Sequence, residues 1–313
     1  MIIDSMNKEL NGVAHLAHMG VIRVEGEDAA KFLHGQLTQD FALLSGSEAR
    51  LTAFCSAKGR MLASFIGIKR SDNDILLICS RDILATTLKR LSMFVMRARA
   101  KLSDASNDFE LRGLAGSAAN QFAQVAGFTD APWSKLDVGA ASLISLYPAN
   151  GVPRVLWVAP VDEPIPSGEA MDTAQWLLSE VHSGIATISA ATVEAFVPQM
   201  LNYESVGGVN FKKGCYPGQE VVARSQFRGT LKRRAFLAHS TAPMAAGDEI
   251  FQADDGSQPC GTVVQAAMEL SGGFDAIISG QVAALQSHSL RLGSSSGPLV
   301  ELLQMPYALL DDI

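Results

Sequence analysis

The chain has 313 residues, of which 48 % are hydrophobic and 18 % charged. This length predicts more than one domain, and the composition excludes a disordered chain. The net charge of −7 is opposite to that of general nucleic-acid-binding proteins, so any site for anions must be local.

Signals for export, membrane insertion and metal binding are missing from the sequence. Residues 1–9 lack the basic and apolar regions of a secretory signal, and no apolar run approaches the roughly 20 residues that span a bilayer. We therefore expect a cytoplasmic protein. The cysteines, Cys55, Cys79, Cys215 and Cys260, form no C-x-x-C pair, which argues against both a disulfide framework and a self-contained metal site.

The first 105 residues alternate between strand and helix patterns. Residues 21–24 predict a strand, and Asp28 is a suitable cap for a helix with Phe32, Leu33 and Leu37 on one face. Three apolar runs separated by turn residues then predict a meander, and leucines at helical spacing predict a helix from about Asp82. The three runs are 51–55, 61–68 and 75–79. The meander and this helix predict an α+β unit over about residues 47–105.

The remaining chain divides into a mixed part and a β-rich part. Residues 110–148 contain short elements whose order the sequence does not reveal, and residues 172–182 predict a helix. Evenly spaced apolar runs from residue 233 onward predict a small antiparallel barrel. These runs are 235–238, 249–253, 262–265, 276–278 and 300–303.

The most informative segment surrounds Cys215. Glycines precede and follow this residue, Pro217 is suited to a first helical position, and Lys212 and Lys213 lie beside it. A thiol just before a helix N-terminus and near lysines is stabilised as the reactive, metal-ligating thiolate. A small buried hydrophobic role for Cys215 is the alternative, and the sequence leaves both open.

Basic residues gather in two segments of this acidic chain. Residues 212–234 carry seven basic side chains and one acidic one, whereas residues 83–103 carry five basic side chains and no acidic one. The basic residues are Lys212, Lys213, Arg224, Arg228, Lys232, Arg233 and Arg234 in the first segment, and Lys89, Arg90, Arg97, Arg99 and Lys101 in the second. They predict either solvated faces or contacts with a polyanionic ligand or RNA phosphates. The methionines Met93 and Met96, inside the second segment, are expected in the core.

From Lys212 to Arg224 the sequence closely resembles the YgfZ family of folate-binding proteins, whose signature is K-G-C-Y-x-G-Q-E. Residues 213–220 read KGCYPGQE. The resemblance extends to residues 196–199, to the pair Gly207-Gly208, to the turn after Cys55, and to residues 32–40, which are similar to the family motif F-L-x-G-Q-x-T-x-D. The family is related to the aminomethyltransferase, or T-protein, of glycine cleavage.

The resemblance implies an α+β fold with a three-lobed, T-protein-like arrangement around a central hole. Residues 1–46 and 106–231 would form a discontinuous folate-binding core domain. Residues 47–105 would form an inserted ferredoxin-like domain, and residues 232–313 a C-terminal antiparallel β-barrel.

The resemblance also implies a ligand and a role. The ligand is tetrahydrofolate or a related folate, and the role is assembly or repair of iron–sulfur clusters, including those of radical-SAM enzymes that thiomethylate tRNA. The partners would be iron–sulfur proteins or their assembly machinery, with tRNA as a further contact and no membrane. Cys215 would supply the reactive thiol or metal ligand. The expected folate-binding residues are Gln199, Asn202, Lys212, Lys213, Tyr216, Gln219, Glu220 and Arg224.

One departure from the transferase pattern affects the expected chemistry. Where aminomethyltransferases carry an Asp pair next to the folate, this chain has Leu62 and Ala63. Because apolar side chains hold no proton, we expect aminomethyl transfer by that route to be lost. A folate-dependent aminomethyl- or methyltransferase and a tRNA-binding module are the competing hypotheses.

Overall fold

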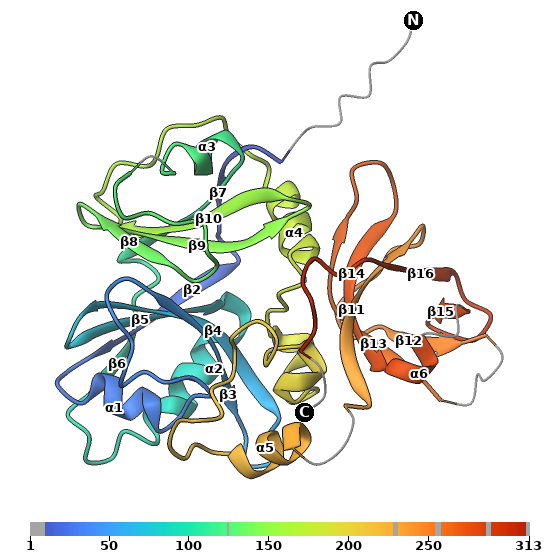
Figure 1. Ribbon diagram of the computed structural model, residues 1–313, viewed down its shortest axis with the longest axis horizontal. Coiled ribbons are helices and arrows are strands. Elements are labelled where there is room, and N and C mark those ends of the chain that lie inside the picture. Colours follow the sequence, from blue (N-terminus) through green and yellow to red (C-terminus); the bar gives the residue numbers. More distant parts are fainter. Residues whose placement is uncertain (1–9, 124, 228–230, 254–257, 286–288, 311–313) are drawn as a thin grey trace, which may run out of the picture.

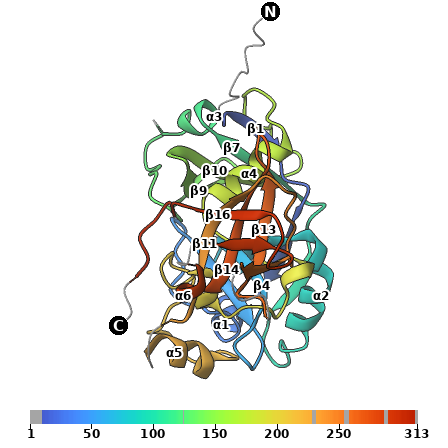
Figure 2. The ribbon, with the colours of Figure 1, turned by 90° about the vertical axis from the view of Figure 1, so that its right-hand side faces the viewer.

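The computed structural model describes residues 10–123, 125–227, 231–253, 258–285 and 289–310. Figure 1 shows three lobes, which are two antiparallel sheets and a closed barrel. When the molecule is turned by 90°, the barrel lies in front of the two sheets (Figure 2).

The first sheet has the strand order β3-β4-β5-β2-β6. Its strands are β2 (Met19–Glu25), β3 (Ala49–Cys55), β4 (Met61–Ser71), β5 (Asp74–Ser80) and β6 (Lys101–Asp104). The predicted meander is confirmed as β3, β4 and β5. Strand β2 pairs with both β5 and β6, so this sheet extends across the boundary expected between residues 46 and 47. Pairing between distant strands leaves no local signal in the sequence, and the division of the chain into domains stays a prediction.

Two helices accompany this sheet. The helix expected near Asp82 is confirmed as α2 (Arg81–Ser92), which buries Ile83, Leu84 and Leu91. Helix α1 (Ala29–His34) is shorter than expected, since Leu37 lies beyond its end. Asp28 makes no side-chain cap, because its carboxylate accepts the backbone N–H of Arg99 instead.

The second sheet has the order β1-β7-β10-β9-β8. Its strands are β1 (Gly12–His15), β7 (Phe109–Ala115), β8 (Lys135–Val138), β9 (Ala141–Ala149) and β10 (Val152–Pro160), and α3 (Ser117–Asn120) follows β7. The helix expected at 172–182 is confirmed as α4 (Thr173–His182), whose cap Asp172 accepts the backbone N–H of Ala174 at 2.8 Å. Trp176 of α4 packs directly on Gly113 of β7, where any added Cβ would lie 2.5 Å from the indole ring.

The predicted C-terminal barrel is confirmed, with the order β11-β14-β13-β12-β15-β16. Its elements are β11 (Arg233–Ser240), β12 (Glu249–Gln252), β13 (Gly261–Met268), β14 (Phe274–Gln281), α6 (Val282–Leu285), β15 (Leu290–Leu292) and β16 (Leu299–Leu303). The five predicted runs correspond to five of these strands. Strand β15 was not predicted because only three residues form it.

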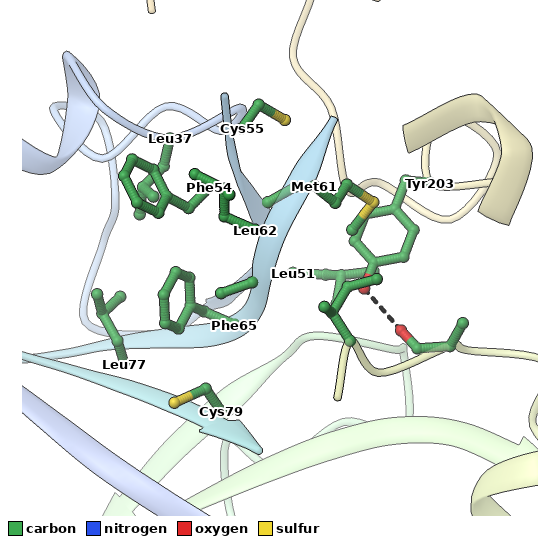
Figure 3. Close-up of a cluster of buried hydrophobic side chains, with 14 of the residues drawn as sticks. Leu37, Leu51, Phe54, Cys55, Met61, Leu62, Phe65, Leu77, Cys79 and Tyr203 are labelled. Carbon is green, nitrogen blue, oxygen red and sulfur yellow. Dashed lines mark hydrogen bonds between the residues drawn. The ribbon is translucent and has the colours of Figure 1, made fainter. Parts of the chain in front are cut away.

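The segment after α4 joins the first sheet to the barrel. It contains η1 (Ala190–Thr192), η2 (Pro198–Leu201) and α5 (Gln219–Phe227). On one side the backbone N–H of Met61 donates to the carbonyl of Phe196, and on the other Ser279 donates to the carbonyl of Met200. The largest hydrophobic cluster fills this junction, with Tyr203 donating its hydroxyl to the carbonyl of Ala186 at 2.7 Å (Figure 3).

Candidate functional site

The stretches that carry the family resemblance lie side by side in the structure. Gln39 Nε2 donates to the carbonyl of Gly207 at 2.6 Å, and Thr38 Oγ1 donates to the carbonyl of Gly208 at 2.7 Å. The backbone N–H of Asn210 in turn donates to the carbonyl of Thr38 at 2.9 Å. Residues 32–40 therefore hold the loop that leads to Cys215, although about 170 positions separate the two stretches.

Lys213 is buried and connects this loop to the end of α1. Its ammonium donates to the carbonyls of His34 at 2.5 Å and Leu37 at 3.0 Å, and lies 4.6 Å from the ring centre of Tyr216. The side chain therefore fixes the turn rather than facing a ligand. The expected folate-binding role of Lys213 stays a prediction, and a ligand there would have to compete with these two carbonyls.

Cys215 is exposed, whereas Cys55, Cys79 and Cys260 are buried. Burial raises the pKa of the Cys55 and Cys79 thiols to about 12, which keeps both of them protonated. Figure 3 shows these two sulfurs inside the hydrophobic cluster. The small hydrophobic role considered for Cys215 is therefore wrong.

A close contact between two turns fixes the segment after Cys215. Helix α5 begins at Gln219, so Pro217 lies in the preceding turn and not at the first helical position. Gly218 has φ of +81°, and a Cβ there would lie 2.4 Å from the carbonyl oxygen of Ser56. Only glycine fits this approach, which packs the 215–218 turn against the turn at Gly59.

His34 and Asp40 are polar neighbours of the Cys215 turn that the sequence did not single out. His34 Nδ1 lies 3.0 Å from Asp40 Oδ1, and an added Cβ at Gly214 would lie 3.3 Å from His34 Nε2. Burial acts to raise the pKa of Asp40, but the backbone N–H of Leu43 and the His34 imidazole outweigh it and lower that pKa. Both residues belong to the 32–40 motif, and this motif is the sequence signal that could have identified them as site residues.

Gln199 lines a cavity of about 420 Å³ between η2, α5 and the barrel. Its side chain is 1 % exposed, and its Nε2 donates to the carbonyl of Val222 at 2.7 Å. Its Oε1 is buried and has no hydrogen-bond partner among the described residues. Lys232 and Arg233 also line this cavity. The cavity is thus bordered by two basic residues and by Gln199, whose amide oxygen is buried without a partner among the described residues.

Asn202 and Arg234 are buried and hold the loop and the barrel together. Asn202 Nδ2 donates to the carbonyl of Ala235 at 2.9 Å, and its Oδ1 accepts the N–H of Ala235 at 3.2 Å. Arg234 Nη1 pairs with Glu204 Oε1 at 2.7 Å. Arg234 was expected to face an anionic partner, and its burial against Glu204 shows that this expectation is wrong.

The other predicted site residues lie along the outer side of this region. Lys212, Glu220 and Arg224 are exposed, Gln219 is half-buried, and Tyr216 is buried under the Lys213 ammonium. Arg228 lies outside the described residues. The structure therefore brings Lys213, Cys215 and Tyr216 together on one turn, and places Gln199 in the separate cavity.

Within the described ranges, no three His, Cys, Asp or Glu side chains gather closely enough to hold a metal ion. A cluster on Cys215 would need ligands from a partner. No described helix has the length and apolarity to cross a membrane.

The buried ammonium of Lys213 predicts a pH-dependent stability difference. Burial lowers its pKa from 10.5 to about 8, so between these values the unfolded chain binds more protons than the folded one. The contribution of Lys213 to the free energy of unfolding must then rise with pH. Relative to Lys213→Met, the wild type should gain about 2 kcal/mol between pH 7.5 and pH 9.5 in urea titrations. A difference that stays constant with pH would contradict the burial of the charge.

Known proteins resemble this chain in sequence and in fold. Residues 6–146 match the model of the GCVT N-terminal domain. The solved aminomethyltransferase T of the glycine cleavage system from Bartonella henselae superposes with a TM-score of 0.69 at 15 % identity, covering 95 % of this chain and 86 % of that one. The expected T-protein-like fold is thereby confirmed.

Curated relatives extend over nearly the whole chain. The tRNA-modifying protein YgfZ of Edwardsiella ictaluri (strain 93-146) is 31 % identical over 302 residues, which cover 92 % of this chain and 89 % of the relative. The protein of the same name from Klebsiella pneumoniae (strain 342) is 34 % identical over 267 residues, covering 80 % and 79 %. With the signature turn at Cys215 and the T-protein-like fold, these matches show that the chain belongs to the YgfZ family of tRNA-modifying proteins.

Proposed function

We propose that this protein is a cytoplasmic, folate-binding accessory protein that supports assembly or repair of iron–sulfur clusters. Its clients would include the radical-SAM enzymes that thiomethylate tRNA. The observation that carries the folate part is the cavity at Gln199, where a buried amide oxygen lacks a partner among the described residues. The exposed thiol of Cys215 carries the iron–sulfur part.

The cavity suits the chemistry of a folate. A pterin ring presents N–H donors along one edge, and the burial of Gln199 Oε1 without a bond is costly, so a small turn of this side chain toward the cavity would give the oxygen a donor. Lys232 and Arg233 suit the carboxylates of a glutamate tail. A volume of about 420 Å³ lies in the range of small-molecule sites.

A larger cavity of about 680 Å³ fits a folate less well. It lies between α3, the β9–β10 turn and α4, and no Lys or Arg is among its described lining residues, whereas Glu269 is. An anionic glutamate tail would meet the Glu269 carboxylate there, and the described lining supplies no Lys or Arg to compensate. We therefore assign the folate to the cavity at Gln199.

The structure gives no support to the transferase alternative. Leu62 and Ala63, which replace the expected carboxylates, are both buried in the hydrophobic cluster of the first sheet (Figure 3 labels Leu62). A carboxylate at either position would be desolvated among apolar side chains. The role we propose therefore requires the protein to bind a folate but does not require it to transfer an aminomethyl group.

Titration of the purified protein with tetrahydrofolate tests the folate assignment. We expect saturable binding, and tighter binding of the triglutamate than of the monoglutamate form. In the double variant Lys232→Ala/Arg233→Ala, the triglutamate should lose about tenfold more affinity than the monoglutamate, because charge-assisted hydrogen bonds to the tail disappear. Arg90→Ala, on the surface far along the chain from this cavity, is the matched control and should bind as the wild type does. Absence of saturable binding to the wild type would overturn the assignment.

A further inference from the structure

The segment that follows α2 exposes large apolar side chains. Met93 is 70 % exposed, Phe94 42 % and Met96 87 %. Their expected place in the core is therefore wrong. Met96 also has φ of +42°, a left-handed backbone conformation that a residue with a side chain adopts only at a cost. Water-exposed apolar groups gathered in so short a segment are typical of an interaction surface.

Basic side chains flank these apolar groups in the sequence. Lys89, Arg90, Arg97, Arg99 and Lys101 are all exposed, and no acidic residue occurs between positions 83 and 103. Arg99 pairs with Glu27 and Asp28, whereas none of the other four takes part in an ion pair with a described residue. The dipole of α2 accounts for Lys89 and Arg90 in its last turn, but not for Arg97 and Lys101 beyond it.

This surface is anchored to the rest of the first sheet. The Phe94 ring meets the ring of buried Phe54 edge-on, with centroids 6.4 Å apart. Phe54 pairs through its backbone with Leu37, and the carbonyl of Leu37 accepts a hydrogen bond from Lys213. The apolar and basic segment is thus tied, through two buried residues, to the turn that carries Cys215.

We propose that residues 89–101 form an RNA-binding surface, which we call the 89–101 surface, and that its partner is tRNA. Phosphates would contact the basic side chains Arg90, Arg97 and Lys101. Unstacked nucleobases would lie on the apolar side chains Met93, Phe94 and Met96. Basic side chains interleaved with flat or flexible apolar ones match RNA, which presents both charge and base faces. An acidic protein helix or an anionic bilayer would be the competing partners.

The burial of basic residues favours this surface over the basic segment at 212–234. There, Lys213 and Arg234 are buried in contacts with the protein itself, so they are not available to phosphates. The name of the relatives, tRNA-modifying proteins, bears on the partner and favours tRNA over other anions. The 89–101 surface retains four exposed bases without an ion pair to any described residue.

Binding of the full chain to an unmodified tRNA transcript tests this inference. We expect Arg90→Ala/Arg97→Ala/Lys101→Ala to lower the affinity at least about tenfold at 0.15 M salt. The slope of log affinity against log salt should become less negative by about two, because the variant loses three phosphate contacts and each contact releases about 0.7–0.9 counterions. Met93→Ser/Met96→Ser should lower the affinity roughly fivefold and leave that slope unchanged. Arg81→Ala, at the other end of α2, is the matched control and should change neither quantity.

The outcomes separate this inference from the folate assignment. All variants of the 89–101 surface should keep the wild-type affinity for tetrahydrofolate, so loss of tRNA binding alone supports the surface. Absence of tRNA binding by the wild type, or equal binding by the triple variant, would overturn it. So would vesicles of phosphatidylglycerol or poly-glutamate displacing the tRNA at equal charge concentration, since either would identify a different partner.

Discussion

Replacing Cys215 by Ser should abolish complementation of a strain that is deficient in iron–sulfur-dependent tRNA thiomethylation, the process that the proposed function supports. Cys215 is the exposed thiol among the four cysteines, all of which lie in the described part of the chain. A serine hydroxyl has nearly the same shape, but it neither ionises near neutral pH nor binds iron as a soft thiolate does. The measurement is the amount of thiomethylated nucleoside in hydrolysed tRNA.

Two further measurements make the Cys215 result decisive. The purified Cys215→Ser protein should unfold at the wild-type temperature and bind tetrahydrofolate normally, because the side chain is exposed and outside the cavity at Gln199. The matched variant Cys260→Ala removes a buried thiol of the barrel and should complement fully. If Cys215→Ser complemented as well as the wild type, the proposed role of the thiol would be wrong.

Local patterns in the sequence predicted those parts of the fold that local interactions determine. The alternating runs became β3, β4 and β5, and the leucine spacing from residue 84 became α2. Asp172 caps α4 as a polar residue before a helical pattern should. In each case the residues that form the element also carry its signal.

The pairing of distant strands could not be predicted from the sequence, because the partners lie far apart along the chain. Strand β2 lies between β5 and β6, and β1 pairs with β7, about 100 positions away. Neither partner's sequence specifies the other, so the boundaries of the two sheets required the structure. The same limit applies to the contacts of Thr38 and Gln39 with the glycines at 207 and 208.

The sequence predicted the Cys215 turn well and the roles of the charged residues poorly. The glycines around Cys215 indicated a tight turn, although α5 begins two residues later than Pro217 suggested. Charge runs, however, indicate exposure only on average, and burial of Lys213 and Arg234 depends on carbonyls and on Glu204 contributed by other segments. Met93 and Met96 were misassigned because an apolar stripe past a helix end resembles one inside it.

Replacing Arg234 by Ala should lower the free energy of unfolding by about 3–5 kcal/mol. The ion pair of Arg234 with Glu204 joins the first residues of β11 to the loop after η2, and the Glu204 side chain is fully buried. Arg234 also donates through Nη2 to the carbonyl of Leu310 at 2.8 Å. Removing the guanidinium leaves a buried carboxylate without its positive partner, which is why the expected loss exceeds that of an ordinary surface pair. Urea denaturation at pH 7 measures it.

The double variant Arg234→Met/Glu204→Gln separates the cost of an unpaired charge from the cost of lost packing. It removes both charges while keeping side chains of similar length, so it should recover most of the stability that Arg234→Ala loses. The lining of the cavity at Gln199 includes Arg233 but neither Arg234 nor Glu204, so the double variant should also keep tetrahydrofolate binding. Equal destabilisation of the two variants would show that packing, and not the buried carboxylate of Glu204, determines the loss. If the unpaired carboxylate of Glu204 determines the loss, Arg234→Ala must be much less stable than the double variant.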